Sequence, residues 1–159
     1  MPINVVNRRN TIESAQNVNM TLPARATRVL LERVPAVYGA SMQDVLLTAL
    51  VQAWREWTGS GSLLLGLEGH GREELVEGVE LSRTVGWFTA LFPVQLEIGE
   101  AGGAGGREAE ELHAVQRTLE RVPQHGVGYG ILRYLRRKAR VGQDLAKLPQ
   151  AELCFNYLG

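Results

Sequence analysis

The chain has 159 residues, enough for one domain, and its 45% hydrophobic content can fill a core. Its 17 basic and 17 acidic residues give a formal net charge of zero, so no global field attracts nucleic acid or an anionic membrane. No apolar run approaches the ~20 residues of a membrane span, and the polar start does not resemble a signal peptide. We therefore expect a cytoplasmic chain with no nucleic acid and no membrane as partners.

The N-terminal residues predict an extended segment followed by a strand. Residues 1–17 are polar and nearly patternless, so we expect them to be extended ahead of a folded lobe at 18–159. Apolar and polar side chains alternate over residues 18–22, which is typical of a half-buried strand.

Two helices are predicted next. Pro23 suits the first turn of a helix that extends to Val34 with an apolar inner face, and residues 35–40 would form the loop after it. Ser41 is a good N-cap for a second helix, in which apolar residues recur at spacings of three and four before Gly59.

A leucine-rich run at residues 63–67 predicts a buried strand, and Glu68 follows it directly. Gly69 and Gly71 then allow the backbone to turn. An acid at the mouth of a buried strand is costly to desolvate unless it is paired or used. Glu68 is therefore a candidate acid or base, and a solvated turn residue is the alternative interpretation.

The second half of the chain predicts alternating strand and helix. Residues 84–98 indicate a strand in which Pro93 marks an edge, a bulge or a start. Residues 101–106 contain only Ala and Gly and predict a flexible connection. Residues 107–122 predict a helix that Pro123 ends.

The last segments predict a basic helix at 131–141 and a final apolar strand at 151–158. Cys154, the single cysteine, cannot form an internal disulfide, and its apolar neighbours predict a small buried hydrophobe. Three scattered histidines and one cysteine make no metal site. The order of elements favours an α/β fold, as layered α+β with helices packed on a sheet.

Several segments together resemble the epimerization domains of nonribosomal peptide synthetases, in the order and spacing of that family. The helix at 43–50 agrees with the family, and four motif segments carry the resemblance: 68–73 (EGHGRE), 83–89 (RTVGWFT), 123–130 (PQHGVGYG) and 155–159 (FNYLG). Ordinary condensation domains share the fold, but the EGHGRE string is typical of the epimerizing branch.

The resemblance implies one lobe of a two-lobe enzyme. Family members have two chloramphenicol-acetyltransferase-like lobes with mixed sheets, and the first carries a His-His-x-x-x-Asp-Gly motif whose second His is catalytic. His70, His113 and His125 lie in no such motif, so the chain resembles the C-terminal lobe alone. We expect the N-terminal lobe as its partner, no activity without it, and self-association through an exposed apolar face.

The family inverts the Cα of an aminoacyl or peptidyl thioester carried on the 4'-phosphopantetheine arm of a peptidyl carrier protein. The resemblance therefore implies a carrier-protein partner and no cofactor bound directly. It assigns one proton-transfer role to the His of the other lobe and one to Glu68. Asn156 and Tyr157 match family residues near the active site, and packing of the face between the lobes is the equal alternative for both.

Three further residues are candidates for orienting or contacting substrate. Arg72 lies four residues after Glu68 and would orient a carboxylate or contact substrate, unless it forms a structural ion pair. His70 is interpreted as a turn residue beside the site, and Trp87 as part of the substrate side or of the exposed apolar face.

Two other functions stay open at this point. A condensation-type lobe would form a peptide bond instead of inverting a centre. A non-catalytic module would only dock a carrier protein, and the basic residues between Arg133 and Arg140 would suit an acidic carrier surface, unless they form a solvated helix face.

Overall fold

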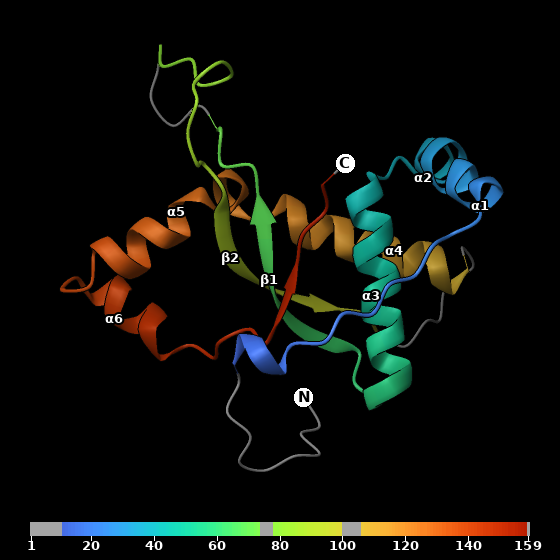
Figure 1. Cartoon of the computed structure of the whole chain (residues 1–159). Coiled ribbons are helices and arrows are strands. Elements are labelled where there is room, and N and C mark those ends of the chain that lie inside the picture. Colours follow the sequence, from blue (N-terminus) through green and yellow to red (C-terminus); the bar gives the residue numbers. More distant parts are fainter. Residues whose placement is uncertain (1–10, 74–77, 100–105, 159) are drawn as a thin grey trace.

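A three-stranded mixed sheet forms the centre of the chain in the computed structural model, which describes residues 11–73, 78–99 and 106–158 (Figure 1). Strand β1 (Ser62–Gly69) lies in the middle. It pairs antiparallel with β2 (Ala90–Glu97) and parallel with β3 (Leu153–Phe155). The mixed sheet with helices packed on it confirms the predicted fold class.

In chain order, the helical segments are η1 (Ile12–Ser14), α1 (Ala24–Arg28), η2 (Val29–Arg33), α2 (Val34–Tyr38), α3 (Met42–Thr58), α4 (Arg107–Glu120), η3 (Pro123–Gly126), α5 (Val127–Gly130), η4 (Ile131–Leu135) and α6 (Arg140–Lys147).

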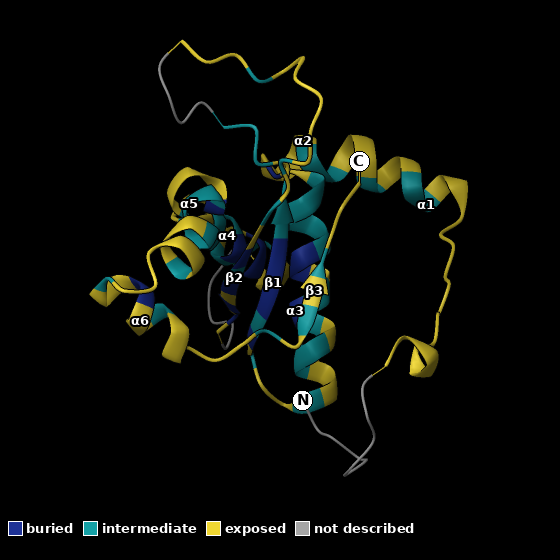
Figure 2. Ribbon diagram, turned by 60° about the vertical axis from the view of Figure 1, so that its left-hand side comes forward, coloured by how far each residue is buried: buried dark blue, intermediate teal, exposed yellow. Residues whose placement is uncertain are grey.

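Side chains alternate along β1, so the two faces of the sheet differ. Leu63, Leu65 and Leu67 are buried in the core. Figure 2 shows buried residues gathered where β1, β2, α3 and α4 face each other. The buried partners of these leucines come from α3, α4, β2 and the residue directly after β2: Leu47, Val51, Phe92, Val94, Leu96, Ile98 and Val115. The opposite face, here called the outer face, carries Leu64, Gly66 and Glu68.

Helix α3 begins and ends where the sequence predicts. The Ser41 hydroxyl accepts a hydrogen bond from the Asp44 amide at 3.1 Å, and the Asp44 carboxylate accepts one from the Ser41 amide at 2.7 Å. This capping box satisfies two amides that the first turn leaves unpaired. Gly59 ends the helix in the left-handed region, with φ of 77°.

The strand predicted at 18–22 is wrong. These residues form no strand and are exposed, Val18 by 90% and Met20 by 93%. Their alternation would need a neighbouring strand edge, and the described part of the chain places none beside them.

The loop predicted at 35–40 is also wrong, because the first helical stretch continues through Pro35 to Tyr38. A π-turn over η2 lets it pass: the Val34 amide bonds to the Val29 carbonyl, and proline lacks the next donor. Val29 is exposed, so the predicted inner face faces no core. No single described helix is long and apolar enough to span a membrane; Ala24–Tyr38 with Met42–Thr58 meets the length and composition test only as a pair bent by 99°.

Three other boundaries differ from the sequence expectations. The strand predicted at 84–98 begins only at Ala90, and the final strand is confined to β3. The basic helix predicted at 131–141 is interrupted between η4 and α6, where Arg136 leaves helical geometry at φ −100° and ψ 32°. Most of the Ala-Gly connection predicted at 101–106 lies outside the described residues.

A buried ion pair joins the two helices that cover the sheet. Glu111 of α4 is 3% exposed, and its carboxylate accepts hydrogen bonds from Gln52 (2.7 Å), Arg55 (2.5 Å) and Arg107 (2.9 Å). Burial by itself raises the pKa of Glu111, but these three donors together outweigh it and hold the pKa below its usual value.

We predict that Glu111→Gln lowers the free energy of unfolding by about 1.5–3 kcal/mol at neutral pH, because it removes charged hydrogen bonds between α3 and α4. Because the pKa of Glu111 is lower in the folded chain, its charged carboxylate stabilises the fold fully above the ordinary glutamate pKa of 4.5. This stabilisation is lost as the pH falls through the pKa of the folded state. Denaturant unfolding of both proteins between pH 7 and pH 3 should therefore show the difference shrinking in acid. Glu108→Gln, on the exposed start of the same helix, is the control; a difference that grows in acid contradicts the prediction.

Candidate functional site

Glu68 lies on the outer face at the end of β1, where β3 brings Asn156 beside it. Leu67 pairs with Phe155 in the parallel ladder, so the residue after each extends to the same face. The Asn156 side-chain amide donates to Glu68 Oε2 at 2.7 Å. Glu68 is half-buried. The carboxylate is therefore held in one orientation by a neutral donor and stays accessible from the outer face.

Cys154 is the second group that contacts this carboxylate, with its Sγ 3.8 Å from Glu68 Oε1. It is exposed, so the prediction of a buried hydrophobe is wrong: in the β3 register it opposes Gly66 on the outer face rather than entering the core. Partial desolvation raises the pKa of the Cys154 thiol, and the Glu68 carboxylate raises it further. The thiol therefore stays protonated and is not an activated nucleophile.

A cavity of about 340 Å³ opens at the end of β1. Glu68 and His70 line it from the strand and the turn that follows, His125 from η3, and Tyr157 from the segment after β3. Tyr157 is 37% exposed. Three segments singled out in the sequence thus meet here, at 68–73, 123–130 and 155–158.

Glu73 links two of these segments. Its Oε1 atom lies 3.2 Å from His70 Nε2 and 3.1 Å from His125 Nδ1. His125 and Gln124 both have φ near +48°, and Gly126 follows at +81°. A Cβ at Gly126 would lie 2.0 Å from the Phe92 ring, so only glycine fits there. This contact between Glu73 and His125 was not predicted, because no local pattern links residues so far apart in sequence.

Arg72 holds the loop that follows the site. Its guanidinium donates to the carbonyl oxygens of Leu81 and, at 2.9 Å, Thr84, and it lies 4.4 Å from the centre of the Phe88 ring. The Arg72 amide donates to His70 Nδ1 at 3.0 Å. Arg72 therefore positions the loop, while Trp87 on that loop is 90% exposed.

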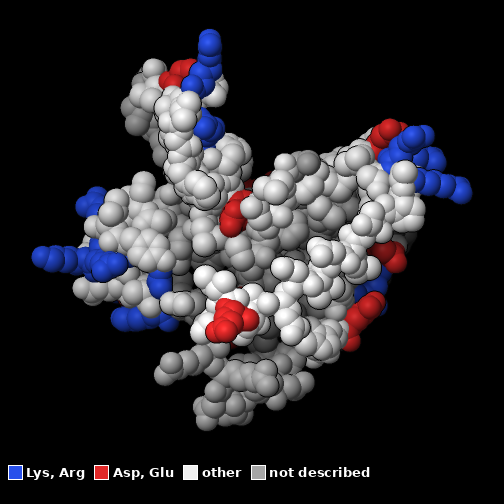
Figure 3. Space-filling view, in the orientation of Figure 1, with Lys and Arg blue, Asp and Glu red and all other residues white. Residues whose placement is uncertain are grey.

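Basic side chains gather at one end of the molecule, over η4 and α6 (Figure 3). The Arg133 guanidinium donates to the Leu145 carbonyl, and Arg140 lies 3.7 Å from Asp144. Arg136, Arg137 and Lys138 are exposed in the turn between these elements. In the part of the chain that the structure describes, no group of three or more His, Cys, Asp or Glu side chains is arranged to hold a metal ion.

The chain matches a family model described as Condensation domain over residues 6–159. One subunit of the linear gramicidin synthase of Brevibacillus parabrevis is 48% identical over 150 residues, which are 94% of this chain and 2% of that protein. Surfactin synthase subunit 1 of Bacillus subtilis (strain 168) is 40% identical over 148 residues, 93% of this chain and 4% of that protein. The chain thus spans a small share of each curated relative.

Solved structures give the same picture. The epimerization domain from the third module of tyrocidine synthetase B superposes with a TM-score of 0.74 at 36% identity, over 86% of this chain and 29% of that one. The first condensation domain of the calcium-dependent antibiotic synthetase, in complex with substrate analogue 2a, superposes with a TM-score of 0.56 at 21% identity, over 72% of this chain and 25% of that one. The second likeness bears on the fold alone.

We predict that Arg72→Lys loosens the loop at 78–88 while the sheet stays intact. Lysine cannot reach two carbonyls and a ring at once, so local opening should become easier by roughly 1–2 kcal/mol, or ~5- to 30-fold. Hydrogen exchange of the Thr84 amide, which bonds to the Leu81 carbonyl, reports this opening. Arg83→Lys, at an exposed position of the same loop, is the control; equal exchange in wild type and Arg72→Lys overturns the prediction.

Proposed function

Because this chain belongs to the condensation-domain family of nonribosomal peptide synthetases, we propose that it forms the Glu68-bearing lobe of an epimerization domain. Its reaction inverts the Cα of an amino acid or peptide held as a thioester on the 4'-phosphopantetheine of a carrier protein. The observation that supports this most strongly is the half-buried Glu68 carboxylate, oriented by Asn156 on the outer face of the sheet.

The chemistry needs two positioned groups. A thioester acidifies its α-proton, and inversion then requires a base on one face of the carbon and a proton donor on the other. Glu68 supplies one of these groups. The N-terminal lobe of the same domain supplies the second as a histidine, so this chain needs that lobe for activity.

Glu68 is suited to repeated proton transfer by its two neighbours. The Asn156 amide and the Cys154 thiol both donate to the carboxylate, and neither carries a formal charge. They fix its orientation without the strong pairing that an arginine would impose. Tyr157 lines the same cavity and can donate its phenol hydrogen to the negative charge that develops on the thioester oxygen.

The loop and turn around the site act as supports. Arg72 and His70 shape the chain that leaves Glu68, and Glu73 Oε1 lies 3.1 Å from His125 of η3. They hold the carboxylate end of β1 in place, which acid–base geometry requires.

The carrier protein is the second partner in this proposal. The exposed Arg136, Arg137 and Lys138 between η4 and α6 form a cationic surface that suits an acidic carrier. If this surface docks the carrier, charge reversal there weakens carrier binding and removes the part of the affinity that salt screens.

Peptide-bond formation is the second candidate function, because the family model that matches residues 6–159 is described as Condensation domain. It makes no use of a carboxylate cycling a proton at Cα. The two reactions are therefore separated by exchange of the α-proton with solvent.

We predict that Glu68→Gln, in the complete two-lobe domain, lowers epimerization by ~10²- to 10⁴-fold, the range of a lost general acid or base. Glutamine keeps the shape and can still accept from Asn156, but it cannot cycle a proton. The measurement is the D/L ratio of the carrier-bound residue against time, with deuterium incorporation at Cα and a thermal melt as a folding control.

Two controls accompany this experiment. Glu97→Gln removes a carboxylate at the other end of the β2 ladder and should keep the wild-type rate. The chain without its N-terminal lobe should incorporate no deuterium above background. A Glu68→Gln rate within about threefold of wild type, far from a lost acid–base group, would show that Glu68 is a structural turn residue.

A further inference from the structure

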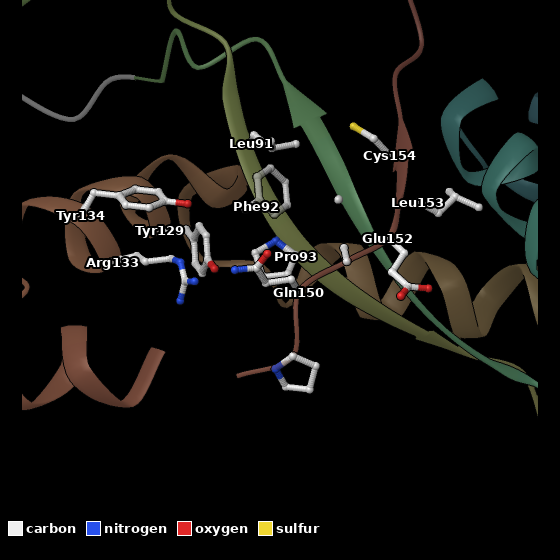
Figure 4. A pocket seen from close by; sticks show the side chains of 13 residues that line it. Leu91, Phe92, Pro93, Tyr129, Arg133, Tyr134, Gln150, Glu152, Leu153 and Cys154 are labelled. Atoms are coloured by element: carbon white, nitrogen blue, oxygen red, sulfur yellow. The ribbon is translucent and has the colours of Figure 1, made fainter. Parts of the chain in front are cut away.

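A second cavity, of about 260 Å³, lies on the outer face next to Glu68. Figure 4 shows Tyr129, Arg133 and Tyr134 on one side of it, Cys154 and Leu153 on the other, and Pro93 and Gln150 between them. We call it the Gly66 cavity, after the β1 residue that forms part of its wall.

The Gly66 cavity lies close to the candidate acid–base group, although Glu68 itself is not part of its lining. Gly66 and Glu68 are two residues apart on the same face of β1, which is ~6.6 Å at ~3.3 Å per residue. Cys154 bridges them, since it pairs with Gly66 in the β3 register and its thiol contacts the Glu68 carboxylate. On the β2 side, Leu91 opposes Glu68 and Pro93 opposes Gly66. The side chain of an amino acid whose Cα lies beside Glu68 is therefore long enough to reach this cavity.

Gly66 sets how much space the cavity offers above the sheet. A Cβ at this position would project from the outer face between its two neighbours, 3.4 Å from Leu91 Cδ1 and 3.9 Å from Cys154 Sγ. These are ordinary contact distances, so the backbone tolerates a side chain here. Any atom beyond Cβ would occupy the cavity itself. Gly66 has no left-handed φ that would explain the glycine by backbone conformation.

The size and lining indicate the ligand class. The volume lies below the ~300–1,000 Å³ of pockets for drug-sized ligands, so it suits one side chain rather than a peptide. Leu91, Pro93 and Tyr129 offer apolar surface near Gly66. The Arg133 guanidinium donates to the Leu145 carbonyl and lies 5.6 Å from the centre of the Tyr134 ring, on the side of the cavity away from Cys154 (Figure 4). Glu152 is the other charged residue of the lining, and its carboxylate points away from Tyr129 and Arg133 (Figure 4). An uncharged aliphatic or aromatic side chain therefore fits best.

We propose that the Gly66 cavity holds the side chain of the carrier-bound amino acid whose Cα lies beside Glu68, and that Gly66 determines the largest side chain accepted. The inference rests on the proposed function, because it places the reacting carbon at Glu68. It adds the substrate class: amino acids with uncharged aliphatic or aromatic side chains.

The test compares alanyl, leucyl and phenylalanyl carrier thioesters in the complete two-lobe domain. Gly66→Val suits the strand, fills the cavity from its floor and should lower the leucyl and phenylalanyl rates by ~10- to 200-fold, while the alanyl rate stays close to wild type. Leu64→Phe is the matched control, because it adds bulk to the same strand and face outside the cavity lining. Adding Leu91→Ala to Gly66→Val should restore part of the leucyl rate.

A second readout does not depend on catalysis. Non-hydrolysable alanyl and leucyl pantetheine thioethers are titrated calorimetrically into the wild type and Gly66→Val, and only the leucyl compound should bind more weakly to the variant. If only the leucyl compound loses affinity in Gly66→Val but the wild type inverts no substrate, the proposed function fails and the cavity assignment stands.

Other results overturn the cavity assignment. An equal loss for all three side chains would show that Gly66→Val acts by distorting the sheet. Unchanged rates and affinities for all three would show that the side chain lies elsewhere. A glutamyl or lysyl thioester turned over as fast as the leucyl one would contradict the uncharged substrate class.

Discussion

The parallel pairing of β3 with β1 is the constraint on which the candidate site depends. It is a short ladder of three residue pairs, yet it brings Asn156 within 2.7 Å of a carboxylate 88 residues earlier in the chain. Without this register Glu68 would end a buried strand with no fixed hydrogen-bond donor. The same register turns Cys154 and Gly66 to the outer face together, so it also forms one wall of the Gly66 cavity.

Contacts around the end of β1 keep this geometry in place. Arg72 holds the following loop through two carbonyls and a ring, and Glu73 Oε1 lies 3.1 Å from His125 Nδ1. On the core side of the sheet, the buried Glu111 joins α3 to α4 and supports the core against which β1 packs. The proposed reaction therefore uses a rigid strand end rather than a loop to hold its acid–base group.

The sequence predicted what depends on local patterns and missed what depends on long-range partners. Strand β1, the position of Glu68 at its end and both ends of α3 follow from an apolar run, periodicity and caps. The alternation at 18–22 predicted a strand wrongly, because alternation does not reveal whether a partner edge exists. Cys154 stands in an apolar triplet with no alternation, so only the β3 register fixes its face. The Glu73–His125 contact joins distant segments that no local signal connects.

Our central claim is that the reacting carbon lies on the outer face of the sheet, at the end of β1. The most direct measurement is a crystal structure of the complete two-lobe domain with a non-hydrolysable leucyl pantetheine thioether bound. We predict the leucyl Cα on the outer face against the Glu68 carboxylate, with the Glu68–Asn156 hydrogen bond intact and the side chain over Gly66. A ligand whose Cα lies away from Glu68, with the Gly66 cavity unfilled, would contradict this claim.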